Sequence, residues 1–216
     1  MATLLTPSPS IPTLADLLVR LGGVSPDRVR YFPQPGTATE ADVIDIEARE
    51  NRLYELIDGV LVEKPMGFRE SLVAGYIVTA LNNFVLPRKA GVVSGADGMM
   101  RLFPGMIRIP DVAYISRERL PGGRVPQQPV PDLVPDLAVE VLSEGNTDPE
   151  MQRKRREYFD AGVRLMWVIE PNSRTALVYS SFDDVTELTG NQDLDGGTVL
   201  PGFTLPLQSV FAVLDV

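Results

Sequence analysis

The stretch from residue 135 to residue 162 constrains the fold most, because it places two charged residues where a folded chain needs apolar ones. Residues 137–142 form an apolar run with the length and β-branched content of a strand covered on both faces, and Glu140 alone interrupts it. Residues 147–150 (TDPE) then supply a capping hydroxyl, a proline and an acid, which predict a helix start. Gly162 is typical of a helix end.

The predicted helix turns a lysine toward the same interior. Met151, Lys154, Tyr158 and Ala161 recur at spacings of three and four, so they share one helix face. Tyr158 is interpreted as core packing. Lys154 lies on the same face and points inward, as does Glu140 in the strand.

The length of 216 residues and the 44 % hydrophobic content suit one α/β domain with a sizeable core. We predict a division into a small helical N-terminal appendage, residues 1–50, and a main domain, residues 51–216. Short amphipathic patterns at residues 14–21 and from residue 39 toward residue 52 predict the helices of the appendage.

The chain contains no histidine and no cysteine, which limits its chemistry. Serine–histidine triads, thiolate nucleophiles and imidazole or thiolate metal sites are excluded, so carboxylates, lysine, tyrosine and hydroxyls remain. Any metal would be a hard, oxygen-bound ion such as magnesium. No stretch approaches the ~20 apolar residues that span a bilayer and no secretory leader is evident, so we expect a cytoplasmic protein.

Two further acids interrupt apolar patterns. Residues 54–63 predict a β-hairpin around an Asp-Gly turn, and Glu55 lies within its first strand. Residues 69–86 predict a long helix, and Glu70 occupies the inward spacing near its start, where the helix dipole favours a carboxylate. Each could equally be an exposed hairpin residue or a helix-start acid.

Asp111 follows a proline inside a predicted strand, residues 106–115. Because proline lacks the backbone donor that a central strand needs, we predict that this strand lies at a sheet edge or bulges at Pro110. As a purely structural residue, Asp111 would cap a turn at the strand end.

Asp111, Glu140 and Lys154 form an ordered set suited to phosphodiester cleavage. Two carboxylates on neighbouring strands can chelate a divalent ion, and a nearby lysine can orient or deprotonate water and stabilise developing negative charge. A plain buried ion pair between Glu140 and Lys154 is the alternative interpretation. The additional inward acids favour the functional one, since one ion pair does not explain them all.

The same residues resemble the PD-(D/E)xK restriction-endonuclease-like superfamily, whose signature is Pro-Asp followed on the next strand by an acid, any residue and lysine. Leu142 occupies the lysine position here. In the Uma-two branch of that superfamily the lysine lies on the following helix, which matches Lys154. Blocks over residues 36–211 resemble that branch in order: YELIDGVLVEKPMG with RESL, IPDVAYI, PDLAVEVLSEGN, KRREYFDAGVRLMWVIEP and LPGF.

This resemblance implies an α/β, restriction-endonuclease-like core with a mixed central β-sheet flanked by helices, and DNA cleavage that depends on Mg²⁺ or Mn²⁺. It implies that Asp111 and Glu140 bind the metal and that Lys154 acts on the attacking water or the scissile phosphate. Glu55 matches the acid of the YELIDG-like block. Glu70 lies where many relatives carry histidine, and would be a further metal ligand or an acid that orients one.

The resemblance also implies a homodimer, since such nucleases pair to address two strands, and exposed edge strands would need covering. One alternative function remains open: a nuclease-fold binding or assembly module whose site is catalytically inactive. The net charge of −9 favours that alternative, because broad phosphate binding is driven by basic residues. The retention of costly buried charges favours the nuclease.

Overall fold

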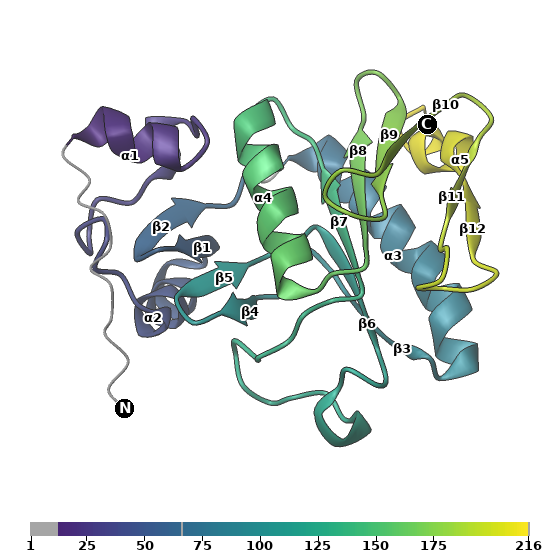
Figure 1. The fold of residues 1–216 in the computed structure, drawn as a ribbon, viewed down its shortest axis with the longest axis horizontal. Coiled ribbons are helices and arrows are strands. Elements are labelled where there is room, and N and C mark those ends of the chain that lie inside the picture. The colour runs from purple at the N-terminus through teal and green to yellow at the C-terminus, as the bar shows by residue number, and fades with distance from the viewer. Residues whose placement is uncertain (1–12, 66, 216) are drawn as a thin grey trace.

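The computed structural model describes residues 13–65 and 67–215, so residues 1–12 of the predicted appendage lie outside the described part. Its centre is a six-stranded sheet in the order β10-β9-β8-β7-β6-β3. Strands β7 and β8 run parallel and the other neighbours run antiparallel, so the sheet is mixed. Helix α4 covers one face, and α3 and α5 cover the other (Figure 1). The predicted architecture, a mixed sheet flanked by helices, is therefore confirmed.

The central sheet and its helices come mostly from the second half of the chain. The strands are β3 (Gly91–Ser94), β6 (Val112–Ser116), β7 (Leu137–Val141), β8 (Leu165–Glu170), β9 (Thr175–Tyr179) and β10 (Val185–Thr189). The helices are α3 (Phe68–Arg88), α4 (Asp148–Ala161) and α5 (Leu207–Ala212). A small hairpin, β11 (Asp193–Asp195) with β12 (Thr204–Pro206), precedes α5.

A second sheet, in the order β2-β1-β5-β4, lies on the other side of α4 from β8 and β9 (Figure 1). Its strands are β1 (Tyr54–Ile57), β2 (Val60–Glu63), β4 (Met100–Phe103) and β5 (Met106–Arg108). Two helices accompany it, α1 (Leu14–Arg20) and α2 (Glu40–Glu50). The predicted hairpin is the β1–β2 pair, with Leu56 opposite Leu61.

The prediction of a single strand over residues 106–115 is wrong. The chain makes two strands there, β5 and β6, and they belong to different sheets. Neither is an edge strand, and residues 109–111 connect them. Pro110 therefore lies where the chain passes from one sheet to the other. Proline has no backbone N–H to donate, and at this position the hydrogen bonding between strands stops, so none is needed. This crossing puts Asp111 beside both sheets.

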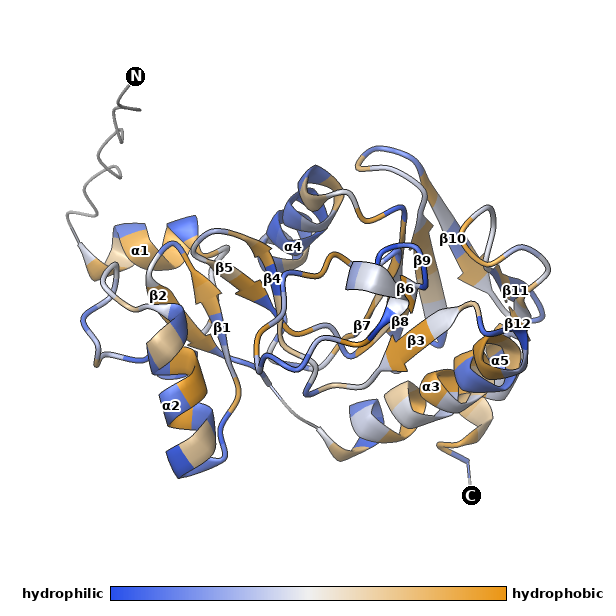
Figure 2. Ribbon diagram, turned by 90° about the horizontal axis from the view of Figure 1, so that it is seen from below, coloured by the Kyte–Doolittle hydropathy of each residue, from blue (hydrophilic) through white to orange (hydrophobic). Residues whose placement is uncertain are grey.

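Helix α4 begins and ends where its sequence predicts. The Thr147 hydroxyl accepts a hydrogen bond from the Glu150 N–H at 3.2 Å, and Pro149 lies in the first turn, where no backbone donor is needed. Gly162 ends the helix with a φ of 99°, a left-handed conformation that favours glycine. In Figure 2 the helix is largely blue, although its inner face covers the sheet.

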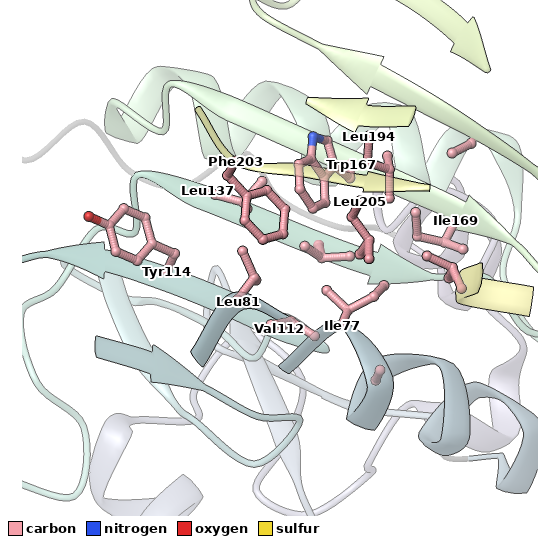
Figure 3. Close-up of a cluster of buried hydrophobic side chains, with 14 of the residues drawn as sticks. Ile77, Leu81, Val112, Tyr114, Leu137, Trp167, Ile169, Leu194, Phe203 and Leu205 are labelled. Carbon is pink, nitrogen blue, oxygen red and sulfur yellow. The ribbon is translucent and has the colours of Figure 1, made fainter. Parts of the chain in front are cut away.

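The face of the sheet opposite α4 is packed with apolar side chains, the α3-side core. It contains the alternate residues of β6, β7 and β8, together with Ile77 and Leu81 of α3 and Phe203 from the C-terminal segment (Figure 3). The rings of Trp167 and Phe203 are stacked with centroids 6.2 Å apart. Residues 137, 139 and 141 of β7 face this core, so residues 138 and 140 face α4.

Residues 13–50 pack against the second sheet. Leu17 and Leu21 of α1 belong to one buried cluster with Val62 of β2, while α2 packs its buried side chains on β1 and β5. The predicted domain boundary at residue 50 stays a prediction, since packing does not tell whether either part folds alone. None of the helices in the described ranges is long and apolar enough to cross a membrane.

Candidate active site

Six charged side chains meet between the two sheets under α4, and we call them the charge cluster. Each comes from a different position of the fold: β1, the residue after β2, β5, the crossing between the sheets, β7 and α4. They are Glu55, Lys64, Arg108, Asp111, Glu140 and Lys154. All are buried except Asp111, whose side chain is 14 % exposed.

Lys154 is the centre of the cluster. Its Nζ lies 3.0 Å from Glu140 Oε2 and 3.3 Å from Glu55 Oε1, and its side chain is 2 % exposed. One helical turn later, the Tyr158 hydroxyl donates a hydrogen bond of 2.7 Å to Glu140 Oε1. The prediction that the strand acid and the helix lysine both point inward is confirmed.

Glu55 is held by the second sheet. Arg108 donates to Glu55 Oε2 at 2.5 Å, and the Ile109 N–H donates to Glu55 Oε1 at 3.2 Å. Arg108 also bonds Glu157 of α4, with its Nε 2.9 Å from Oε2. The arginine therefore ties β5 to β1 and to the helix that carries Lys154.

Asp111 is fixed at the crossing between the sheets. Its backbone N–H donates to the Val139 carbonyl at 3.0 Å, and its Oδ2 accepts from the Val141 N–H at 2.7 Å. Val139 and Val141 flank Glu140 in β7, so Asp111, which directly precedes β6, lies beside the part of β7 that carries Glu140. Asp111 Oδ1 lies 2.9 Å from the Nζ of Lys64.

The acids of the cluster differ in electrostatic environment. Burial would raise the pKa of Glu55, but the charges of Arg108, Lys154 and Lys64 lower it to about 2. Burial raises the pKa of Glu140, and the negative charge of Asp111 acts in the same direction, against the opposing effect of Lys154. The ionised form of Glu140 is therefore less well compensated than that of Glu55.

Lys154 has the opposite balance. Burial alone lowers the pKa of a lysine, but the carboxylates of Glu140 and Glu55 raise the pKa of Lys154 above its ordinary value. The pKa of the Tyr158 hydroxyl is raised by burial and by the Glu140 charge. Both groups are therefore protonated at neutral pH, which makes them donors.

The carboxylate oxygens of Asp111 and Glu140 are of the kind that a hard divalent ion takes, and these two acids would be its protein ligands if such an ion binds. No group of three or more acidic side chains suited to hold an ion occurs within residues 13–65 and 67–215, so water or backbone oxygens would complete the coordination. Mg²⁺ commonly keeps several waters and takes one or two carboxylates. The Asp111 charge helps to raise the pKa of Glu140, and a cation shared by both acids would relieve that repulsion.

Glu70 is not brought into the charge cluster by any ion pair or hydrogen bond among the described side chains. It is partly exposed in the first turn of α3, and its carboxylate folds back over Gly67, where an added Cβ would collide with it. An acid at this end of a helix interacts favourably with the helix dipole. Its predicted role as a ligand or orienting acid stays a prediction.

Three residues of the site were not identified from the sequence. Tyr158 was assigned to core packing, yet its hydroxyl contacts Glu140. Lys64 and Arg108 were not singled out. A signal for Arg108 was present, because it interrupts the apolar strand MIRI as Glu140 interrupts its own strand. For Lys64 no pattern existed, since a lysine after a hairpin strand is ordinarily exposed.

A solved structure with a similar fold indicates the class of protein. The fold is similar to a crystal structure described as "a putative nuclease belonging to DUF820 from Anabaena variabilis", with a TM-score of 0.67 and 19 % identity. The match covers 75 % of this chain and 91 % of the other. The chain thus shares its mixed α/β fold, a central mixed sheet flanked by helices, with that structure.

The family follows from the sequence itself. The model of the Uma2 family, described as "Putative restriction endonuclease", matches residues 41–208, and the chain belongs to this family. No curated protein matches the chain. The resemblance to the Uma-two branch is confirmed.

Proposed function

We propose that the protein is a metal-dependent endonuclease that hydrolyses phosphodiester bonds of DNA. The observation that carries the proposal is the bonding of Asp111 to the two residues that flank Glu140 in β7, with the Nζ of Lys154 3.0 Å from Glu140. Membership of a family whose description is "Putative restriction endonuclease" supports the reaction class. Asp111 and Glu140 would bind Mg²⁺ or Mn²⁺, which supplies charge stabilisation and lowers the pKa of a bound water.

Lys154 serves as a cation rather than as a base. Because Glu140 and Glu55 raise its pKa, its amine is protonated at neutral pH and has hydrogens to donate. It holds Glu140 in place and stabilises negative charge that develops on the scissile phosphate. Tyr158 orients the other oxygen of Glu140, and Glu55 with Arg108 fixes the lysine from the opposite side.

The test is a plasmid-nicking assay with Mg²⁺ or Mn²⁺. Asp111→Asn and Lys154→Met should each lower the nicking rate by roughly 10²- to 10³-fold, the size of effect seen when one electrostatic stabiliser is removed. Asp193→Asn changes an exposed acid on β11, is the matched control for Asp111→Asn and should nick at the wild-type rate. Equal nicking by all four proteins would attribute the activity to another site or to contamination.

A second function, that of an inactive nuclease-fold binding module, is favoured by one specific observation. In the charge cluster three acids face three cations, and each carboxylate already has a cationic partner. Such a balanced set is stable without an ion. If calorimetry detects no Mn²⁺ binding at millimolar concentration and no nicking occurs, this second function replaces the first.

DNA as substrate and a homodimer as the working form belong to the same proposal. Strands β10 and β3 end the central sheet, and edge strands are the natural places for pairing with a second copy. Sedimentation of the wild-type protein checks the dimer directly. A monomer that nicks DNA would remove the dimer from the proposal and leave the chemistry intact.

A further inference from the structure

Lys64 is a buried lysine to which the proposed reaction gives no role. It directly follows β2, and its backbone N–H donates to the Leu53 carbonyl at 3.0 Å. The side chain turns inward and is 3 % exposed. Its Nζ donates to the Ile109 carbonyl and lies 2.9 Å from Asp111 Oδ1. Both contacts are at the crossing between the sheets.

The cations of the charge cluster are distributed unequally. Glu55 is contacted by both Arg108 and Lys154, and Glu140 by Lys154 together with the Tyr158 hydroxyl. Among the described side chains, Lys64 is the one cation within ion-pair distance of Asp111. Removing its charge would therefore leave the partners of Glu55 and Glu140 in place.

A divalent ion would enter a site whose charges already balance. In the charge cluster three carboxylates face three cations and all but Asp111 are buried, so two added positive charges meet repulsion that this environment screens poorly. The repulsion is strongest from the two cations already bound to the proposed ligands of the ion, Lys154 at Glu140 and Lys64 at Asp111. Lys154 also contacts Glu55, whereas Lys64 pairs with Asp111 alone among the described carboxylates.

We propose that Lys64 is an internal counter-cation that occupies Asp111 and competes with the divalent ion for it. This inference rests on the proposed function, because it takes Asp111 as a metal ligand. Lys64 thereby sets how tightly the protein binds metal: it stabilises the metal-free site and lowers the affinity for the ion. It is a positioning residue in this role and contacts no reacting atom.

Binding of Mn²⁺ followed by isothermal titration calorimetry tests the inference. Lys64→Met removes the charge and keeps an unbranched side chain of similar length, and it should bind Mn²⁺ at least about tenfold more tightly than the wild type. Lys64→Arg, which keeps the charge, should not bind more tightly. Arg164→Met is the matched control for net charge, since Arg164 is bonded to Asp136 at the start of β7 and should leave the affinity unchanged.

Thermal unfolding gives a second measurement. Without metal, Lys64→Met should melt below the wild type, because Asp111 loses its cation, and Mn²⁺ should raise its melting temperature more than that of the wild type. Lys64→Gln keeps a donor for the Ile109 carbonyl and serves in place of Lys64→Met if that variant does not fold. It too should bind Mn²⁺ more tightly than the wild type.

Asp111→Asn separates the two possible failures. If the wild type binds Mn²⁺, Asp111→Asn does not, and the neutral Lys64 variants bind equally or more weakly, the inference is overturned while the metal site stands. If neither the wild type nor any Lys64 variant binds Mn²⁺, the metal-dependent function fails and the inference fails with it. Binding by Lys64→Met alone would support both.

Discussion

The two faces of the central sheet are built from the same strands but differ in chemistry. On the face toward α3, β7 presents residues 137, 139 and 141 to a core that is apolar throughout. On the face toward α4 it presents Ala138 and Glu140, and Glu140 meets Lys154 and Tyr158. The difference teaches that the α3 face is packed with apolar side chains alone, whereas the α4 face combines apolar packing with buried charges, a combination typical of functional sites.

The largest effect on stability is expected from removing one partner of the buried Glu140–Lys154 pair on the α4 face. Lys154→Met leaves Glu140 buried without its cation, and removing one partner of a buried pair costs roughly 3–5 kcal/mol. Chemical denaturation should show this loss in the free energy of unfolding. The double variant Lys154→Met with Glu140→Leu should recover most of it, since an apolar pair needs no compensation. A double variant as unstable as the single one would contradict the buried-pair interpretation.

The apolar face should respond in stability alone. Leu81→Ala removes a fully buried side chain of the α3-side core and should cost about 2–5 kcal/mol. Leu86→Ala, in the same helix but 61 % exposed, is the matched control and should change the stability little. Calorimetry should find that Leu81→Ala binds Mn²⁺ as the wild type does. A changed affinity would show that the two faces are coupled.

Lowering the pH should remove the stability that ionised Glu55 contributes to the folded protein. The pKa of Glu55 in the folded protein is about 2, below the usual 4.5, so the folded state favours its ionised form. The resulting stability is fully present above pH 4.5 and is lost as the pH falls toward 2, by about 3 kcal/mol in all.

Urea unfolding between pH 6 and pH 2.5 measures this contribution. The stability difference between the wild type and Glu55→Gln should be constant above pH 4.5 and shrink below it. The exposed variant Glu187→Gln should show a much smaller pH dependence. A difference that persists to pH 2.5 would mean that Glu55 does not carry the charge assigned to it.

The smallest effect is expected from Tyr158→Phe. This change removes only the hydroxyl that donates to Glu140 Oε1, and a hydrogen bond to a charged group contributes about 1.5–3 kcal/mol. If the hydroxyl orients Glu140, the nicking rate should also fall while the affinity for DNA stays the same. An unchanged nicking rate together with lowered stability would mean that Tyr158 serves only in packing, as predicted from its helix position.

The sequence by itself determined the bounds of α4 and the meeting of Glu140 with Lys154. The caps at Thr147 and Gly162 define α4, and the periodicities of a strand and a helix oblige Glu140 and Lys154 to point to the same interior. Local backbone preferences and side-chain spacing decide the helix ends and the inward direction of Glu140 and Lys154, so both can be predicted without tertiary contacts. The order of family motifs determined the fold class in the same way.

Only the tertiary structure decided how the charges are shared. The strand predicted over residues 106–115 crosses between two sheets, and this crossing brings Asp111 to β7 and Arg108 to Glu55. Lys64 reaches Asp111 over 47 positions of sequence, and no local pattern specifies such a partner. Ion pairing depends on distance and burial in three dimensions, which spacing along the chain does not contain.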